Sequence, residues 1–307
     1  MHKSVLLNEC ILMLNLKEDG CYVDATLGYG GHTSEILKRV KKGKVFCFDM
    51  DDYACKCSYD KLSKDFNNFE IINSNFVNLK EELNKRGVYE IDGILFDLGV
   101  SSVQLDEKDR GFSFHKDAKL DMRMDRSNKL SAYSVVNEYN LDELTRIFRE
   151  YGEEKYAHSI ADKIVKYRSN KNIETTLELV DIIRSGMPYS ASRDHHPARR
   201  VFQAIRIEVN KELDNLDKAL RDSLDMLKVG GRCLVITFHS LEDRIVKDIF
   251  KKYSYMDPNL KNLPYIPTEC SPEYKIISNK IVPSREEVKE NNRARSSKLR
   301  VIERIKG

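Results

Sequence analysis

The sequence predicts an α/β protein with a doubly wound, mostly parallel sheet that is interrupted by an all-helical insertion. Strand and helix patterns alternate four times before residue 97, as in sheets whose parallel strands are joined by helices. No strand pattern occurs between residues 106 and 196, after which a helix and a fifth strand return. We therefore expect a sheet domain of residues 1–106 and 197–307, and a helical substrate-recognition domain of residues 107–196.

The rest of the chain is organised around residues 22–32, YVDATLGYGGH. This stretch reads as a buried strand that ends at Asp24, then a turn containing Gly28, Gly30 and Gly31, then the start of a helix. A glycine turn before a helix N-terminus lets the backbone approach a nucleotide-like ligand closely. The pattern therefore indicates a nucleoside cofactor, although such turns also occur for geometric reasons alone.

A second strand, residues 44–48, leads to Asp49, about 20 residues after the glycines, the reach of an acid that binds ribose hydroxyls. A dinucleotide site requires G-x-G-x-x-G, whereas this turn reads D-x-x-x-G-x-G-G, with Asp24 as the leading acid. An acid that faces the ligand suits an amine or a cation better than a pyrophosphate. The pattern therefore favours S-adenosylmethionine (SAM) over NAD.

Two further strands bring candidate residues to the same edge of the sheet. Residues 69–72 lead to Phe76, whose ring could either stack on an adenine or belong to the core. Residues 91–97 form an apolar run typical of a central parallel strand. Because ligands bind at the carboxyl ends of such strands, Asp97 and residues 98–104 are the best candidates for the reacting end of the site.

Helix signals continue through the insertion and beyond it. Asn140 is a predicted N-cap, and Thr175 with Glu178 forms a predicted capping box. Apolar residues at steps of three and four from Val201 to Leu227 predict one long helix. The fifth strand, residues 232–238, is followed by His239 and Ser240, and closing strands are expected at residues 274–277, 280–282 and 297–302.

The composition describes an ordinary globular protein, with 41% apolar and 33% charged residues. The 52 basic and 49 acidic residues give a net charge of only +3, so a nucleic-acid surface would have to be local. The seven cysteines include no C-x-x-C, which supports neither a disulfide framework nor a metal site. Without a signal peptide or a long apolar run, we expect a soluble, cytoplasmic protein that does not bind membranes.

Two local basic clusters would suit RNA phosphates. One lies at the start of the predicted long helix, beside the His195–His196 pair, and the other lies near the C-terminus. Basic runs are often merely solvated faces, and adjacent histidines point apart on a helix, so no metal site is expected. The candidate RNA-binding residues are Arg199, Arg200, Arg206, Arg293, Arg295 and Lys298.

Several motifs together resemble the RsmH/MraW family of bacterial ribosomal RNA cytosine-N4 methyltransferases, over residues 3–304. They are GYGGH (28–32), DGILFDLGVSS (92–102), LDMRMD (120–125), FQAIRIEVNKEL (202–213), FHSLEDR (238–244) and NRARSSKLR (292–300). The resemblance implies a Rossmann-like SAM-dependent fold with a mostly parallel seven-stranded sheet and an inserted helical domain. It also implies methylation of the exocyclic N4 of one cytidine in the decoding region of 16S ribosomal RNA, with the small ribosomal subunit as partner; a homodimer is left open. The implied SAM contacts are Gly30, Gly31, His32, Asp49, Phe76, Asp97 and Gln104.

Methyl transfer from a sulfonium is an in-line displacement, so positioning supplies much of the rate. Asp97 is the first candidate for orienting the amine or the cofactor, and His239 and Ser240 are the second. Methylation at carbon 5 is disfavoured because it needs a nucleophilic cysteine, commonly beside a proline, and no cysteine here adjoins one. An NAD-binding oxidoreductase and a non-enzymatic ribosome assembly factor are the alternatives.

Overall fold

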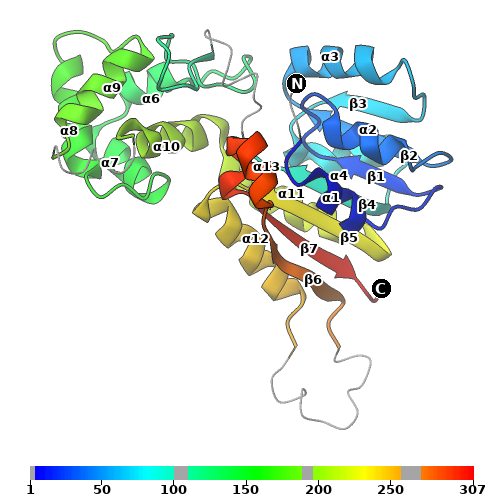
Figure 1. Cartoon of the computed structure of the whole chain (residues 1–307). Coiled ribbons are helices and arrows are strands. Elements are labelled where there is room, and N and C mark those ends of the chain that lie inside the picture. Colours follow the sequence, from blue (N-terminus) through cyan, green and yellow to red (C-terminus); the bar gives the residue numbers. More distant parts are fainter. Residues whose placement is uncertain (1–3, 100–109, 189–195, 257–270) are drawn as a thin grey trace. The chain divides into compact units, whose positions relative to one another are not determined.

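The computed structural model describes residues 4–99, 110–188, 196–256 and 271–307 (Figure 1). The chain forms two compact units, one of residues 1–99 and 213–307 and the other of residues 100–212. The sequence had placed the helical segment at residues 107–196. In the structure, the helix that follows residue 196 also belongs to the helical unit, because its apolar face packs into that unit's core.

The first unit is built on a seven-stranded sheet with the order β3-β2-β1-β4-β5-β7-β6 (Figure 1). Neighbouring strands are parallel from β3 to β5, whereas β7 runs antiparallel to both β5 and β6. This arrangement confirms the prediction of a mostly parallel seven-stranded α/β sheet. The strands are β1 (Cys21–Asp24), β2 (Lys44–Asp49), β3 (Phe69–Asn73), β4 (Ile91–Asp97), β5 (Leu227–Thr237), β6 (Tyr274–Ile281) and β7 (Lys298–Arg304).

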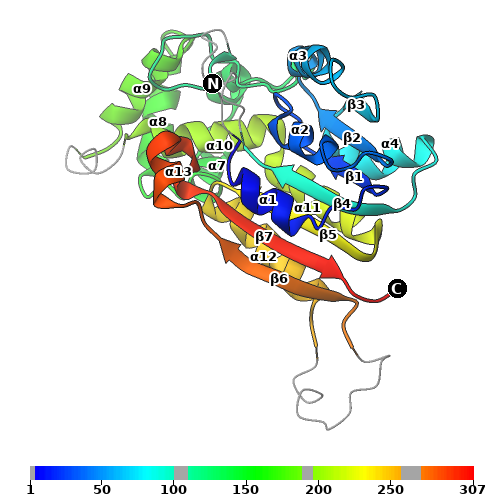
Figure 2. The ribbon, with the colours of Figure 1, turned by 45° about the vertical axis from the view of Figure 1, so that its right-hand side comes forward.

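Helices cover both faces of this sheet, as parallel strands require. One apolar cluster joins the sheet to α4 (Leu79–Lys85), α11 (Glu212–Asp225) and α12 (Ser240–Tyr253). A second cluster joins the other face to α1 (Leu7–Met13), α2 (Gly31–Leu37) and α3 (Asp52–Leu62), and α1 lies in front of the strands in Figure 2. The C-terminal part adds α13 (Arg285–Glu290) and the short η5 (Asn292–Ser296), whereas η1 (Phe76–Asn78) follows β3.

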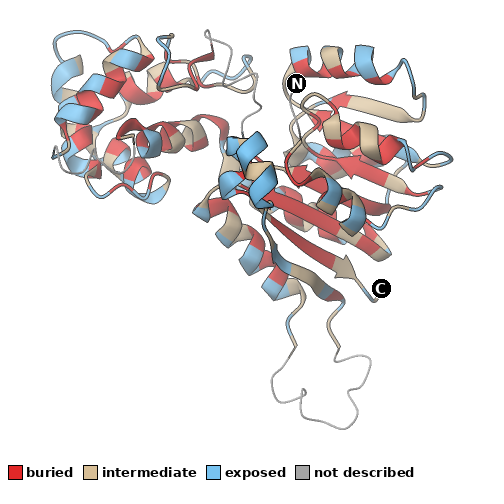
Figure 3. Cartoon of the chain, viewed as in Figure 1, coloured by how far each residue is buried: buried red, intermediate tan, exposed pale blue. Residues whose placement is uncertain are grey.

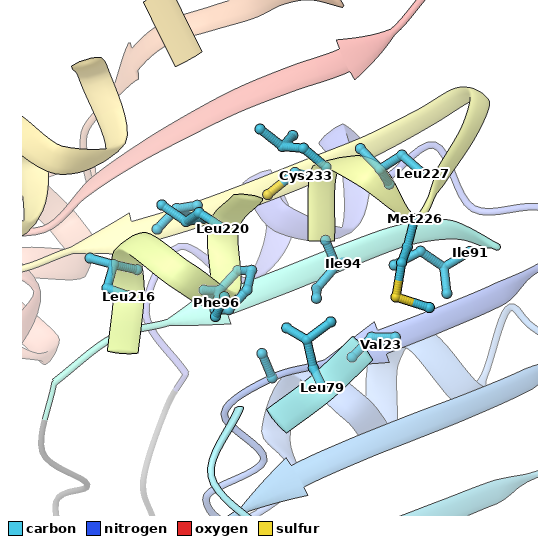
Figure 4. Packing of buried hydrophobic residues seen from close by; sticks show 14 of the residues in the cluster. Val23, Leu79, Ile91, Ile94, Phe96, Leu216, Leu220, Met226, Leu227 and Cys233 are labelled. Carbon is cyan, nitrogen blue, oxygen red and sulfur yellow. The ribbon is translucent and has the colours of Figure 1, made fainter. Parts of the chain in front are cut away.

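The central strands are buried on both sides, which explains their continuous apolar runs. Every residue of β4 except Asp97 is buried. Phe96 and Ile94 point into the cluster that Leu216 and Leu220 of α11 complete (Figure 4). Because apolar residues fill the interior of β4, its single partly exposed residue, Asp97, falls at the carboxyl end of the strand, where ligands of such sheets bind.

The second unit is helical and has its own core (Figure 3). Asn140 and Thr175 each form the predicted N-cap, and in both cases the glutamate three residues later completes a capping box. The helices are α6 (Ala132–Glu138), α7 (Leu141–Glu150), α8 (Ala157–Arg168), α9 (Thr176–Ser185) and α10 (Ala198–Asn210). No helix among the described residues is long and apolar enough to cross a membrane.

The single long helix predicted from Val201 to Leu227 is wrong. The chain forms α10 and α11 separately, because Lys211 between them has φ 51° and ψ 40°, in the left-handed region. The two closing strands expected at residues 274–277 and 280–282 are likewise one strand, β6, with shifts in its pairing register. Neither difference alters the sheet edge that carries the candidate site.

Candidate active site

The glycine turn lies between β1 and α2. Gly28 and Gly30 have φ values of 49° and 67°, which side chains of L-residues rarely adopt. A Cβ atom at Gly31 would lie 2.0 Å from the Ser4 Oγ atom, so the N-terminal segment approaches the turn closely. By contrast, apart from its chain neighbours, no described residue places an atom within 4 Å of where a Cβ atom at Gly28 would lie. The turn therefore requires its glycines for two reasons, backbone conformation and close approach.

Asp24, at the end of β1, braces this turn from inside. Its side chain is 1% exposed, and its two oxygens accept hydrogen bonds from Thr33 Oγ1 (2.6 Å) and from the Thr26 N–H (3.1 Å). Burial raises the pKa of Asp24, which His32 and these hydrogen bonds oppose. Sequence reasoning treated Asp24 as an acid that faces the ligand. The structure instead gives its carboxylate protein partners on both oxygens.

Asp49 ends β2 and holds the turn from the neighbouring strand. Its Oδ2 atom accepts from the Gly28 N–H at 2.8 Å, and its Oδ1 atom accepts from the Asp51 N–H at 2.9 Å. Burial raises the pKa of Asp49 to about 6, although the two N–H donors favour its charged form. Asp49 therefore fixes the position of Gly28, and each oxygen retains acceptor capacity for a hydroxyl group.

Asp97 ends β4, and its N–H donates to Thr26 Oγ1 at 2.7 Å. The Oδ1 atom of its carboxyl group is buried and has no hydrogen-bond partner among the described residues, while the side chain as a whole remains 24% exposed. Burial, and after it the charges of Asp24 and Glu242, together raise the pKa of Asp97 to about 8. An unpaired buried oxygen of this kind is suited to a ligand donor group or a cation.

His32, in the first turn of α2, faces Asp97. Its Nδ1 atom lies 3.7 Å from Asp97 Oδ2, and its Nε2 atom lies 3.1 Å from the Val5 carbonyl oxygen. Since a carbonyl can only accept, Nε2 carries a proton in that hydrogen bond. The side chain of His32 is only 5% exposed, so the ring links the N-terminal segment to the Asp97 carboxyl group.

Phe76 follows β3 in η1, where the Asn75 side chain accepts from the Val77 N–H at 3.0 Å. The Phe76 ring packs edge-on against Phe96, with centroids 5.7 Å apart and planes at 88°. It is only partly buried against the sheet core. One edge of the ring is thus held by the core, and stacking of the ring on an adenine stays a prediction.

His239 is the N-cap of α12, and its ring is engaged in the cap. Its Nδ1 atom accepts from the Glu242 N–H at 3.4 Å, and its Nε2 atom lies 3.1 Å from Glu242 Oε1. Glu242 in turn accepts from the N–H groups of Phe238 and His239. Ser240 is exposed at the first position of the helix. The sequence did not predict the role of Glu242, because the usual capping pattern begins with Ser, Thr, Asp or Asn and this N-cap is a histidine.

The candidate RNA-binding residues differ in how far they are engaged within the protein. Arg199, Arg293 and Arg295 are exposed, and Arg200 is also exposed but donates to the Glu153 carbonyl oxygen at 3.1 Å. The remaining two are in ion pairs: Arg206 binds both oxygens of Glu212 at 2.8 and 2.9 Å, and Lys298 lies 2.9 Å from Asp243 Oδ2. Gln104, the last predicted cofactor contact, lies outside the described residues.

The sheet, the glycine turn and the acids at three strand ends fit a Rossmann-like, SAM-dependent methyltransferase. The chain belongs to the MraW methylase family, whose model matches residues 1–305. A relative from Exiguobacterium sibiricum, named ribosomal RNA small subunit methyltransferase H, is 51% identical over 307 residues, which cover 99% of this chain and 98% of the relative.

Two solved structures are also similar over nearly the whole chain. One is an rRNA methylase from Streptococcus thermophilus, with a TM-score of 0.46, 14% identity and coverage of 100% of this chain and 99% of that one. The other is a Clostridium thermocellum protein with a TM-score of 0.47, 12% identity and coverage of 99% and 100%.

The residues present fit the SAM cofactor of a methylase. Gly28 leaves space at the turn, and Asp49 follows it by 21 residues, the sequence spacing expected of an acid that binds ribose. Asp97 offers a buried oxygen that has no partner among the described residues. SAM carries an ammonium group and a sulfonium, and acids match a cationic ligand better than they match a pyrophosphate. The donor set therefore agrees with SAM and argues against a dinucleotide.

Proposed function

We propose that this chain transfers a methyl group from SAM to the exocyclic N4 of a cytidine in the decoding region of small-subunit ribosomal RNA. Three observations support the substrate: membership of the methylase family, the name of the 51% identical relative, and the shared motifs. The observation that carries the chemistry is Asp97, a carboxyl group at the carboxyl end of a central strand with a buried oxygen that no described residue satisfies.

The cofactor in this proposal is held at the edge formed by β1, β2 and β4. Bound SAM supplies an electrophilic methyl group. The glycine turn allows close approach of the backbone, Asp49 accepts hydrogen bonds from hydroxyl groups, and Phe76 offers a ring face. The proposed contacts are Gly30, Gly31, His32, Asp49, Phe76, Asp97 and Gln104.

The acceptor amine needs help because the lone pair of cytosine N4 is delocalised into the ring. A carboxylate that accepts a hydrogen bond from this amine, or takes its proton as transfer proceeds, increases its nucleophilicity. A pKa of about 8 places Asp97 close to neutrality, where such a group works best. His239 and Ser240 are the second candidates; His239 could act only by releasing its cap on α12.

The helical unit is the proposed substrate-recognition domain, and the exposed arginines are proposed phosphate contacts. Arg199 and Arg200 lie on α10 of that unit, whereas Arg293 and Arg295 lie on η5. Arg206 and Lys298 are weaker candidates than the sequence indicated, because each already neutralises an acid. A side chain whose charge already neutralises an acid has less charge to offer an RNA phosphate.

The test is to incubate the protein with methyl-labelled SAM and unmethylated small ribosomal subunits, with naked ribosomal RNA in parallel. The RNA is then digested to nucleosides for mass spectrometry. We expect label in N4-methylcytidine. Label in another nucleoside would overturn the assigned acceptor atom, and no label with SAM still bound would favour the assembly-factor alternative.

Asp97→Ala is the accompanying variant. It should lower turnover by about 100-fold or more, as expected for a group that acts on the transferred proton, while its circular dichroism spectrum stays native. Asp92→Ala is unsuitable as a control because Asp92 binds two lysines, whereas Asp52 on the outer face of α3 is exposed and serves well. Near-normal turnover of Asp97→Ala would contradict the role assigned to this residue.

A further inference from the structure

Three aromatic rings lie against one another in the helical unit. The Phe114 ring centroid is 4.5 Å from the ring of His196, with planes at 26°, and 4.5 Å from the ring of His115, with planes at 52°. The two imidazoles are themselves 5.1 Å apart. Phe114, His115 and His196, here called the ring cluster, come from two segments about 80 residues apart in the sequence, so folding of the unit brings them together.

Two rings of the ring cluster are held by contacts with α10, and the third ring is exposed to solvent. Phe114 packs edge-on against Phe202 of α10, with centroids 5.7 Å apart, and Phe202 is 4% exposed within the helical core. The Nδ1 atom of His196 accepts from the Ala198 N–H at 3.3 Å, which sets its ring at the start of α10. His115, by contrast, is exposed. The cluster is therefore a rigid set of rings with one member at the surface.

Stability alone does not account for two imidazoles around one phenyl ring. Burial, then the neighbouring His115, then Arg184 lower the pKa of His196. His196 is thus uncharged at neutral pH and behaves as an aromatic ring. An aliphatic side chain at either position would pack on Phe114 without placing two titratable groups side by side.

Exposed basic residues lie in the segments that carry the cluster and on α9, and one exposed acid, Asp117, lies beside them in sequence. Arg199 is exposed in the first turn of α10, which contains no acidic residue. Arg184 of α9 acts electrostatically on His196, and its ion pair with Asp181 is exposed and 3.4 Å long. Lys116 follows His115 and is also exposed. Aromatic faces among cations are the combination that holds unpaired bases of single-stranded RNA, the rings by stacking and the cations through phosphates.

We propose that the ring cluster is a stacking platform for an unpaired nucleobase of the RNA substrate. The proposal deepens the function proposed above and rests on it for the identity of the ligand as RNA. A metal is not the favoured occupant, because no group of three metal-ligating side chains among the described residues includes His115 or His196. Duplex RNA does not fit either, since its bases are already stacked in the helix.

The test compares two substitutions of the exposed ring, His115→Ala and His115→Phe, with His158→Ala as matched control. His158 is an exposed histidine on α8 of the same unit. Fluorescence anisotropy measures binding of a fluorescein-labelled single-stranded RNA of mixed sequence, and of the same strand annealed to its complement. We expect His115→Ala to weaken single-strand binding about tenfold, His115→Phe to bind like the wild type, and His158→Ala to have no effect.

Each other outcome overturns the platform. Binding by His115→Ala within twofold of the wild type would show that the ring does not contact RNA. Equal losses in the Ala and Phe variants would show that the imidazole nitrogens matter and stacking does not. Equal binding of duplex and single strand by the wild type would exclude an unpaired base. Failure of the proposed methylation would show separately, as absence of label in the nucleoside assay while this binding pattern persists.

Discussion

The Oδ2 atom of Asp97 lies 3.7 Å from Nδ1 of His32, while the other oxygen of the same carboxyl group is buried and has no hydrogen-bond partner in the part of the chain that the structure describes. The Val5 carbonyl holds the proton of His32 on the far nitrogen, so the near nitrogen presents its lone pair to Asp97 when the ring is neutral. A protonated Asp97 fits this surrounding better than a charged one. The Asp97 carboxyl group therefore makes the stability of the folded protein depend on pH, and its buried oxygen is suited to bind a ligand.

Asp97→Asn should stabilise the protein, and the gain should grow with pH. The folded pKa of about 8 lies above the ordinary value of 3.8, so the folded state binds the proton more tightly than the unfolded state does. The ionised Asp97 side chain destabilises the folded state, and this effect is absent below about pH 4 and complete above about pH 8. We expect a gain of about 1–3 kcal/mol at pH 8 and little at pH 4, measured by urea unfolding.

Asp92→Asn is the control with the opposite sign. Burial alone would raise the pKa of Asp92, but hydrogen bonds from the Cys21 N–H, Lys228 and Lys17 outweigh burial and lower it. Its stabilising effect is therefore present at neutral pH and lost as the pH falls below about 4. The variant should be less stable than the wild type at pH 7. If both variants shifted stability in the same direction at pH 8, the account of Asp97 would fail.

Binding of SAM should release a proton near neutral pH. A cation beside Asp97 favours the carboxylate and lowers its pKa from about 8. At pH 7 we expect a release approaching one proton per site, and at pH 9 very little, because the group is then almost fully ionised. Calorimetric titrations with SAM in buffers of different ionisation enthalpy measure this number. Asp97→Asn should show no release, and a wild-type enthalpy independent of buffer would refute the contact.

Asp49→Asn should weaken SAM binding by about 10- to 100-fold, the effect of losing a hydrogen bond to a charged acceptor. An amide has only one oxygen, so it cannot accept from both the Gly28 and Asp51 N–H groups as the carboxylate does. The variant would then lose one of the two hydrogen bonds by which Asp49 holds the backbone near the glycine turn. Asp52→Asn, on exposed α3, should bind SAM normally. Calorimetric titration with SAM measures both affinities. If Asp49→Asn bound SAM within twofold of the wild type, Asp49 would not be a cofactor contact.

The sheet and the strand-end acids could be predicted from the sequence because both arise from local patterns. The apolar run of β4 leads directly to Asp97, and the glycines mark the turn after β1. The brace of Asp24 could not be predicted, since its partner Thr33 lies beyond the turn. The break at Lys211 was also hidden, because the apolar spacing continues across it while one residue takes a left-handed conformation.

Ion pairs between residues far apart in the chain could not be predicted from the sequence either, and they affect which basic residues are able to bind RNA phosphates. Lys298 pairs with Asp243, which lies 55 residues earlier in the chain. A run of basic residues reports charge density but not which of the charges are already neutralised. The structure separates the exposed arginines of η5 from the paired lysine that begins β7.

Replacing Arg293 and Arg295 together by alanine should weaken RNA binding and reduce its salt dependence. Each lost phosphate contact lowers the slope of log affinity against log salt by about 0.7–0.9, so the double variant should lose up to about 1.8. Lys298→Ala is the matched control, since its ammonium group already binds Asp243; its slope should stay near the wild-type value. Anisotropy titrations over a range of salt concentrations measure both slopes. If Lys298→Ala lowered the slope as much as the double variant did, the distinction between the exposed arginines of η5 and the lysine that binds Asp243 would be wrong, and the phosphate contacts would have to be placed along β7.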